Sequence, residues 1–337
     1  METKILTQES VADAARIIKN GGLVVMPTET VYGLGADAFN KQAVANIFRA
    51  KGRPMDNPLI VHIGSIQDLK KVAAEIPEKA IKLAKAYWPG PLTMVLPKAE
   101  CVPDEVSAGL DTVAVRYPSH PLAETLILLS GTLIAAPSAN LSGSPSPTEL
   151  KHVIDDMNGR VDAILDGGSC EVGLESTVIS LVGDVPRLLR PGGVTVDEIE
   201  SVIGEIEIDP AVTDKLKEGQ RAESPGMKYK HYAPQARIII VKGSDEQYIR
   251  YVNSREQKGV GAICFDEDAE KLSVPFFSLG AKDDCQSQAK NLFSVLRSVD
   301  EAGIELAYAR CPKLDGVGLA VYNRLIRAAG FEVIRLA

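Results

Sequence analysis

MPTETVYGLGADA, residues 26–38, directly follows the short apolar run Leu23-Val24-Val25. The apolar run predicts a buried β-strand. A cluster of polar side chains, Thr28, Glu29, Thr30 and Tyr32, stands at its end, just before Gly33 and Gly35. Ligands in α/β folds usually lie at strand ends. The stretch therefore predicts an α/β fold with binding groups at this strand end rather than a plain turn.

The composition is typical of a globular protein of one large or two ordinary domains. The chain has 337 residues, 45% hydrophobic and 24% charged, and its net charge is −8. We expect no membrane-spanning helix and no signal segment. Five cysteines without CxxC spacing argue against structural zinc and predict a cytoplasmic location with free thiols. The acidic total argues against a protein coated in nucleic acid but leaves a local basic cleft possible.

The pattern of apolar runs divides the chain into two α/β domains. Residues 1–205 alternate expected strands (23–26, 58–63, 92–96, 112–117, 132–136) with helices (42–51, 78–88, 121–129, 148–157). The connection 106–113 is too short for a helical crossover, so we expect a mixed sheet. Residues 206–237 are rich in Pro, Gly and charge and predict a linker. A smaller domain follows at 238–337, with helices expected at 286–299 and 317–329.

Several catalytic signatures are missing. The sequence has no GxxxxGK[ST] loop, no HExxH and no GxSxG. GLGADA and GVGAIC resemble dinucleotide glycine patterns, but neither opens a helix within a clear βαβ unit. A P-loop is thereby excluded, and classical acyl-enzyme hydrolysis and a nicotinamide site are disfavoured.

Basic side chains stand beside two of the expected strands. Lys51 and Arg53 lie in a Gly/Pro loop before the strand that ends near His62. The pair suits a phosphate clamp, although a solvated turn after a helix is the commoner case. Arg116 lies in an apolar strand, where it either meets a buried anion or points to water from an edge strand. A lone His62 is more often structural than catalytic.

Hydroxyl groups follow other strands. Residues 135–148, AAPSANLSGSPSPT, place Ser138 and Ser146 in one loop, and GLESTVISL places Ser176 ahead of a strand. Arg190 ends the segment RLLR. Each fragment alone is compatible with an ordinary loop. Together, five such strand ends predict one anion-binding site.

These motifs, in this order, resemble the YrdC-type domain. PTETVYGLG, KGRPMDNPLIVHI, PGPLT, VAVRYP, PSANLSG and ESTVISL…LLRPGG form its signature series. SPGMKYKHYAP and the extra domain resemble the long form of the threonylcarbamoyl-AMP synthase family. The resemblance implies a YrdC-like open twisted mixed sheet with helices and a smaller Rossmann-like α/β domain.

The resemblance also implies a reaction. L-Threonine and bicarbonate form N-carboxy-threonine, which attacks ATP and yields threonylcarbamoyl-AMP and pyrophosphate. Mg²⁺ is expected through the ATP phosphates, and a downstream tRNA threonylcarbamoyl transferase would use the product. No side-chain nucleophile is expected, and Lys51 and Arg53 would stabilise charge. The threonine contacts implied are Thr30, His62, Arg116, Ala136 and Ser176. The ATP contacts implied are Lys51, Arg53, Asn57, Thr112, Ser138, Ser146, Arg190 and Tyr232.

The linker adds one further expectation. In an extended MKYKHY (227–232), Lys228, Lys230 and Tyr232 share one side, which predicts that the linker covers the site as a gate. A passive tether between domains is the alternative. Two other functions stay open: an RNA-binding or ribosome-assembly module with weak RNA affinity and no chemistry of its own, and a carbamoyl transferase acting on another acceptor.

Overall fold

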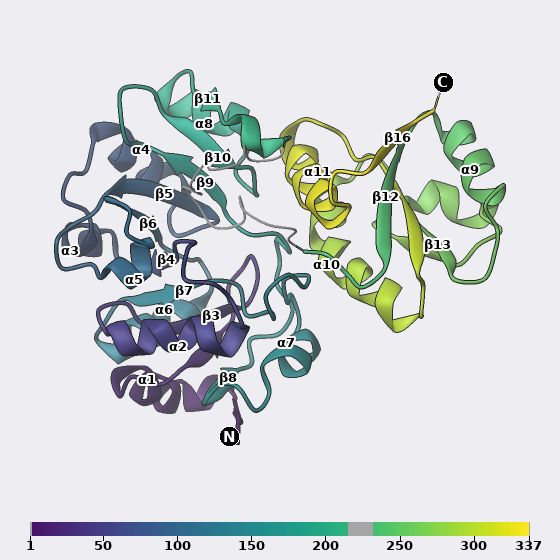
Figure 1. Cartoon of the computed structure of the whole chain (residues 1–337). Helices are drawn as coiled ribbons and strands as arrows, with labels where there is room; N and C mark the ends of the chain where they lie inside the picture. Colours follow the sequence, from purple (N-terminus) through teal and green to yellow (C-terminus); the bar gives the residue numbers. More distant parts are fainter. Residues whose placement is uncertain (1, 215–231, 337) are drawn as a thin grey trace.

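The computed structural model describes residues 2–214 and 232–336 and contains two α/β bodies (Figure 1). The N-terminal body is built on one 11-stranded sheet, and the C-terminal body on a five-stranded sheet. Helices α10 (Cys285–Glu301) and α11 (Gly316–Ala328) lie on the side of the smaller sheet that faces the N-terminal body (Figure 1).

The large sheet is mixed, as the short connections predict. Five of its neighbouring pairs, β1–β8, β8–β2, β4–β6, β5–β9 and β10–β11, are parallel, and the others are antiparallel. In spatial order the strands are β1 (Lys4–Leu6), β8 (Ala163–Leu165), β2 (Val24–Met26), β3 (Gly33–Asp37), β7 (Ile134–Ala136), β4 (Ile60–His62), β6 (Thr112–Arg116), β5 (Leu92–Pro97), β9 (Thr177–Ser180), β10 (Arg187–Arg190) and β11 (Glu207–Ile208).

Eight α-helices among the described residues belong to this body: α1 (Val11–Lys19), α2 (Lys41–Lys51), α3 (Leu69–Val72), α4 (Glu78–Tyr87), α5 (Asp104–Ser107), α6 (Pro121–Ser130), α7 (Leu150–Met157) and α8 (Val196–Ile203). Helix α2 shows how sequence sets the boundaries. Asn40 Oδ1 accepts the backbone N–H groups of Gln42 and Ala43, and Gly52 ends the helix at φ 63°. The buried Ile47 and Phe48 anchor α2 to the core, so its last residue, Lys51, is held rigidly.

The smaller sheet is wholly parallel, in the order β14 (Phe276–Ser278), β13 (Val260–Cys264), β15 (Leu306–Arg310), β12 (Arg237–Lys242) and β16 (Val333–Arg335). Helix α9 (Asp245–Asn253) joins α10 and α11 in covering it. This is a Rossmann-like arrangement, and the predicted fold class is confirmed for both bodies.

The predicted linker holds some regular structure. Glu207 and Ile208 form β11 beside β10, and a 3-10 turn at Pro210–Val212 buries Ala211 and Val212. Residues 215–231, which include Lys228 and Lys230 of the expected gate, lie outside the described residues. The domain limits 1–205, 206–237 and 238–337 stay a prediction.

The two glycines of residues 26–38 lie in a strand. Gly33 and Gly35 belong to β3, so the chain continues as a buried strand after the polar cluster. A Cβ on Gly35 would stand 2.7 Å from Ile134 Cγ2 of the neighbouring β7. Close approach of β7, rather than flexibility, requires glycine at this position.

Within the residues that the structure describes, we find no helix whose length and apolarity would let it cross a bilayer.

Candidate functional site

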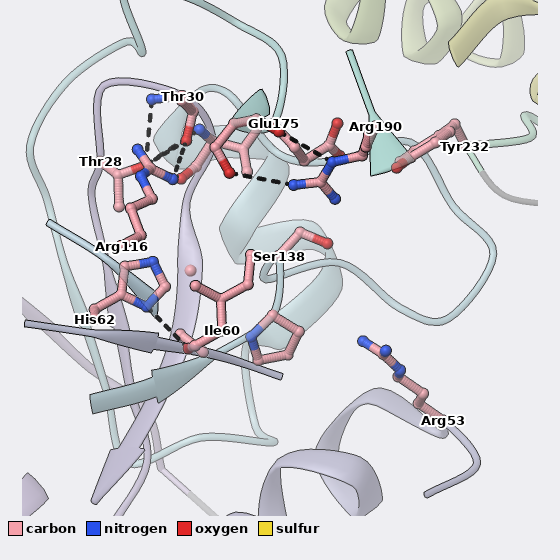
Figure 2. A pocket seen from close by; sticks show the side chains of 15 residues that line it. Thr28, Thr30, Arg53, Ile60, His62, Arg116, Ser138, Glu175, Arg190 and Tyr232 are labelled. Atoms are coloured by element: carbon pink, nitrogen blue, oxygen red, sulfur yellow. Dashed lines mark hydrogen bonds between the residues drawn. The ribbon is translucent and has the colours of Figure 1, made fainter. Parts of the chain in front are cut away.

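A pocket lies at the edge of the large sheet where β4 and β6 end and β9 begins. Residues from several strand ends line the pocket, and they include most of the side chains that the sequence predicts as threonine or ATP contacts. The predicted residues that line it are Thr30, Arg53, His62, Arg116, Ala136, Ser138, Ser176, Arg190 and Tyr232. In Figure 2, Thr28, Thr30, Arg116 and His62 lie on one side of the pocket, and Arg53 and Tyr232 lie on the other.

Strand register explains why these residues meet. His62 and Arg116 are direct partners on the parallel strands β4 and β6, and Thr93 of β5 is opposite Arg116. Ser176 precedes the first residue of β9, which pairs with Leu92 at the start of β5. Arg190 ends the antiparallel β10 beside Val178. The ends of β4, β6 and β10 and the starts of β5 and β9 therefore meet at the same side of the sheet.

Arg116 is buried and meets an anion, so the water-facing alternative is wrong. Its strand is interior to the sheet, between β4 and β5. Arg116 Nη2 lies 2.7 Å from Glu29 Oε1, and Nη1 donates to Thr30 Oγ1 at 2.8 Å. Thr28 Oγ1 lies 2.9 Å from Thr30 Oγ1. Residues 26–38 thus supply the counter-ion and the hydroxyl groups that fix the Arg116 guanidinium.

His62 is held as a neutral imidazole. Burial first, and then the nearby Arg116 cation, lower the pKa of His62 to about 3. Nδ1 lies 3.1 Å from the carbonyl of Ile60, which can only accept, so Nδ1 carries the proton. Nε2 is then an acceptor. The ring is therefore suited to binding a donor rather than to exchanging protons near pH 7.

Ser176 and Arg190 form a second fixed group. Arg190 Nε donates to the Ser176 carbonyl at 3.1 Å, and Nη2 lies 3.3 Å from Ser176 Oγ. Ser176 Oγ also lies 2.7 Å from Thr93 Oγ1. Burial lowers the pKa of Arg190 to about 10, so it stays a cation at neutral pH. His62 Nδ1 bonds the Ile60 carbonyl, and within the described part of the chain we find no hydrogen bond from His62 to either hydroxyl group.

Lys51 is buried rather than solvated and anchors a loop. Its Nζ donates to the carbonyls of Ser138 and Asn140 at 2.5 and 2.6 Å, and Asn140 Oδ1 lies 3.4 Å away. Burial lowers the pKa of Lys51 well below its usual value. An ammonium has three N–H groups, and three acceptors surround this one. Lys51 Nζ therefore bonds the backbone of the loop that carries Ser138, and its expected part in charge stabilisation stays a prediction.

Arg53 lies in the loop after α2 and lines the pocket. Nη2 donates to the Asn57 carbonyl at 3.2 Å, and the guanidinium lies 5.8 Å from the Phe48 ring. Burial lowers the pKa of Arg53 to about 10. Asn57 is buried next to it but does not line the pocket. Among the described residues, no group donates to Asn57 Oδ1.

Ser146 and Thr112 are not in the pocket lining. Ser146 Oγ donates to Glu175 Oε1 at 2.5 Å, so it supports a lining residue from behind. Thr112 begins β6, whereas Arg116 ends it, and four residues of strand span about 13 Å. The structure does not bring Thr112 to the pocket.

Tyr232 reaches the pocket from the start of the C-terminal segment. It is buried, has φ 64° and packs on Phe293 of α10 with ring centroids 5.3 Å apart. Burial raises its pKa. The aromatic ring therefore belongs both to the pocket wall and to the core of the smaller domain.

Thr28, Glu29 and Glu175 are the functional residues for which the sequence predicts no individual partner or ligand contact. All three stand inside the motifs quoted above, so their position was visible, but their partners were not. Across the described ranges 2–214 and 232–336, no three His, Cys, Asp or Glu side chains are grouped as a metal site.

Two family models match the chain. One, of the Sua5–YciO–YrdC group and described as telomere recombination, matches residues 16–192. The other, described as threonylcarbamoyl-AMP synthase, C-terminal domain, matches residues 194–330.

Relatives match over nearly the full length. The chain is 50% identical over 330 residues to the threonylcarbamoyl-AMP synthase of Pyrococcus abyssi, covering 96% of this chain and 95% of that one. It is 48% identical over 329 residues to the Bacillus subtilis protein of the same name, covering 96% and 94%. The crystal structure of P. abyssi Sua5 complexed with L-threonine superposes with a TM-score of 0.92 at 47% identity, covering 100% of both chains. This chain belongs to the Sua5/YrdC family of threonylcarbamoyl-AMP synthases, in its long form with the C-terminal domain.

Proposed function

We propose that this protein makes threonylcarbamoyl-AMP and pyrophosphate from L-threonine, bicarbonate and ATP. One observation carries the proposal: a single pocket joins a guanidinium–hydroxyl group, Arg116 with Thr30, to two further cations, the half-buried Arg53 and the buried Arg190. The first group suits an amino acid, and the arginines suit a polyphosphate.

The threonine subsite is Thr30, His62, Arg116, Ala136 and Ser176. Arg116 attracts the substrate carboxylate, and Glu29 keeps the guanidinium oriented before the substrate arrives. Neutral His62 offers Nε2 to a hydroxyl or N–H donor. Ala136, at the end of β7, offers its backbone carbonyl to the substrate nitrogen.

The ATP subsite is Arg53, Asn57, Ser138, Arg190 and Tyr232. Arg53 and Arg190 neutralise the phosphates, and Asn57 Oδ1 is suited to accept an N–H of the nucleotide. Lys51 and Ser146 act through Ser138 and Glu175, which they hold. Thr112 serves ATP only if the nucleotide extends away from the pocket described above.

The chemistry requires no side-chain nucleophile. The threonine nitrogen adds to bicarbonate with loss of water, and a carboxylate oxygen of the resulting carbamate attacks the α-phosphorus of ATP. The bond from that phosphorus to the bridging oxygen breaks, and pyrophosphate leaves with the electron pair. The protein contributes position and charge neutralisation. Mg²⁺ enters as part of the MgATP substrate.

The product is an activated acyl donor and requires a downstream tRNA threonylcarbamoyl transferase. We place the reaction in the cytoplasm, where ATP, threonine and tRNA occur together. Weak RNA binding is not needed for this chemistry. An RNA-binding module would show salt-dependent RNA affinity and no dependence on threonine.

Pyrophosphate release tests the proposal. The protein is incubated with MgATP, with and without bicarbonate, and with each amino acid in turn. Release that requires both threonine and bicarbonate supports the proposal. Release without threonine dependence, or RNA affinity without turnover, would overturn it.

A further inference from the structure

The side chain of Arg324, in the C-terminal domain, contacts a residue of the pocket wall. Arg324 lies on α11 and is 0% exposed. Its Nε donates to Glu175 Oε2 at 2.9 Å. Glu175 lines the pocket and is itself buried. The two domains therefore share an ion pair directly behind the pocket wall.

The same guanidinium holds two backbone segments of the N-terminal domain. Nη2 donates to the Glu175 carbonyl at 3.0 Å, and Nη1 donates to the Pro191 carbonyl. Ser176 follows Glu175, and Arg190 precedes Pro191. The fork of Arg324 thus ties together the two strand ends that present Ser176 and Arg190 to the pocket.

The contact between Arg324 and Glu175 also sets the net charge of the pocket wall. Burial alone raises the pKa of Glu175, but Arg324, Arg190 and the Ser146 hydroxyl outweigh burial and lower it. Glu175 is therefore an anion in a pocket built for the phosphates of ATP. Without Arg324, that negative charge would lose the cation that pairs with it at 2.9 Å and would repel the nucleotide.

We propose that Arg324 is a positioning residue through which the C-terminal domain completes the ATP subsite, by neutralising Glu175 and by fixing the strand end that carries Arg190. The reaction it serves rests on the proposed function. The placement of the side chain gives the second domain a defined part in the site.

Two variants of the full-length protein test the proposal: one replaces Arg324 alone, and the other replaces Arg324 together with its ionic partner Glu175. We expect Arg324→Met to raise the KM and the Kd for ATP by about tenfold or more, and the KM for threonine less. Arg324→Met/Glu175→Gln removes the uncompensated charge and keeps an acceptor for Ser146. It should recover part of the ATP affinity that the single variant loses.

Two further variants separate this role from folding and docking. Arg324→Lys keeps the charge but loses the fork, so we expect an intermediate ATP Kd. Glu301→Gln breaks another interdomain ion pair, Lys151–Glu301 at 2.6 Å, and should leave the ATP Kd close to that of the unmodified protein. Thermal unfolding of every variant shows whether it is folded at the assay temperature.

The outcomes are distinct. An unchanged ATP Kd in folded Arg324→Met, or no recovery in the double variant, would overturn the proposal. Because ATP Kd needs no turnover, it tests Arg324 even if the unmodified protein fails the threonine-dependent assay. Failure of that assay would count against the proposed function alone.

Discussion

Arg116 Nη2 and Glu29 Oε1 lie 2.7 Å apart, and both side chains are buried. The carboxylate comes from the loop after β2 and the guanidinium from the end of β6, 87 positions later in the sequence. Among the described residues, no group donates a well-aligned hydrogen bond to either Glu29 oxygen. The contact is thus mainly one of charge, and it sets the electrostatics of the threonine side of the pocket.

Removal of Arg116 should cost both stability and threonine binding. Arg116→Ala leaves Glu29 as a buried uncompensated charge, so we expect the free energy of unfolding to fall by about 3 kcal/mol or more. Arg116→Lys keeps the charge and should lose less stability, yet it lacks the guanidinium that faces Glu29 with Nη2 while Nη1 donates to Thr30. Urea unfolding and the threonine KM check both effects. Equal stability losses in the two variants would contradict the charge argument.

The hydroxyl of Thr30 should matter more for threonine than for ATP. Thr30→Val keeps the shape of the side chain but removes the acceptor of Arg116 Nη1. Loss of one such hydrogen bond predicts a rise in the threonine KM of about tenfold, with a smaller change in the ATP KM. Thr132→Val, whose hydroxyl bonds Asp37 rather than a pocket residue, is the matched control. Equal effects of Thr30→Val on both KM values would argue against the assignment.

His62 should make the fold less stable in acid. Its pKa is lowered to about 3 in the folded protein and returns to about 6.5 when the chain unfolds. Between these values the unfolded chain binds a proton that the folded one does not, so this contribution to stability is lost as pH falls below 6.5. Between pH 7 and 5, the stability of the unmodified protein relative to His62→Gln should fall by about 2 kcal/mol. Urea unfolding at both pH values measures the change, and a constant difference would show that His62 does not contribute it.

Gly35 and Gly33 should respond differently to alanine. The Cβ of Gly35→Ala would meet Ile134 Cγ2 at 2.7 Å and the Val24 carbonyl at 3.3 Å, which predicts a loss of about 1–3 kcal/mol in stability. The Cβ of Gly33→Ala would be 3.4 Å from Ala136 Cβ, an ordinary contact, but it would enter the pocket wall. We therefore expect Gly35→Ala to lower the melting temperature and Gly33→Ala to raise KM. The reverse pattern would contradict the packing of β3 against β7.

Several features of the fold and site were predictable from local sequence. Apolar runs such as Leu23–Val25 indicate buried strands, and the polar residues after them, Thr30 among these, mark strand ends. The short connection 106–113 excluded a helical crossover, and the mixed sheet is confirmed. A strand as short as β11 escaped prediction, because two residues carry no readable period.

The partners of the charged side chains were decided only by the tertiary structure. Lys51 looked like a solvated residue or a phosphate ligand, yet it anchors a loop 87 residues away. Glu175 and Arg324 are 149 residues apart and meet only because α11 docks against the ends of β9 and β10. Periodicity and turn chemistry are local, so the sequence determined the strands, their ends and the kinds of group placed there. Which cation neutralises which anion depends on sheet order and domain docking, and burial then made each of those pairings strong.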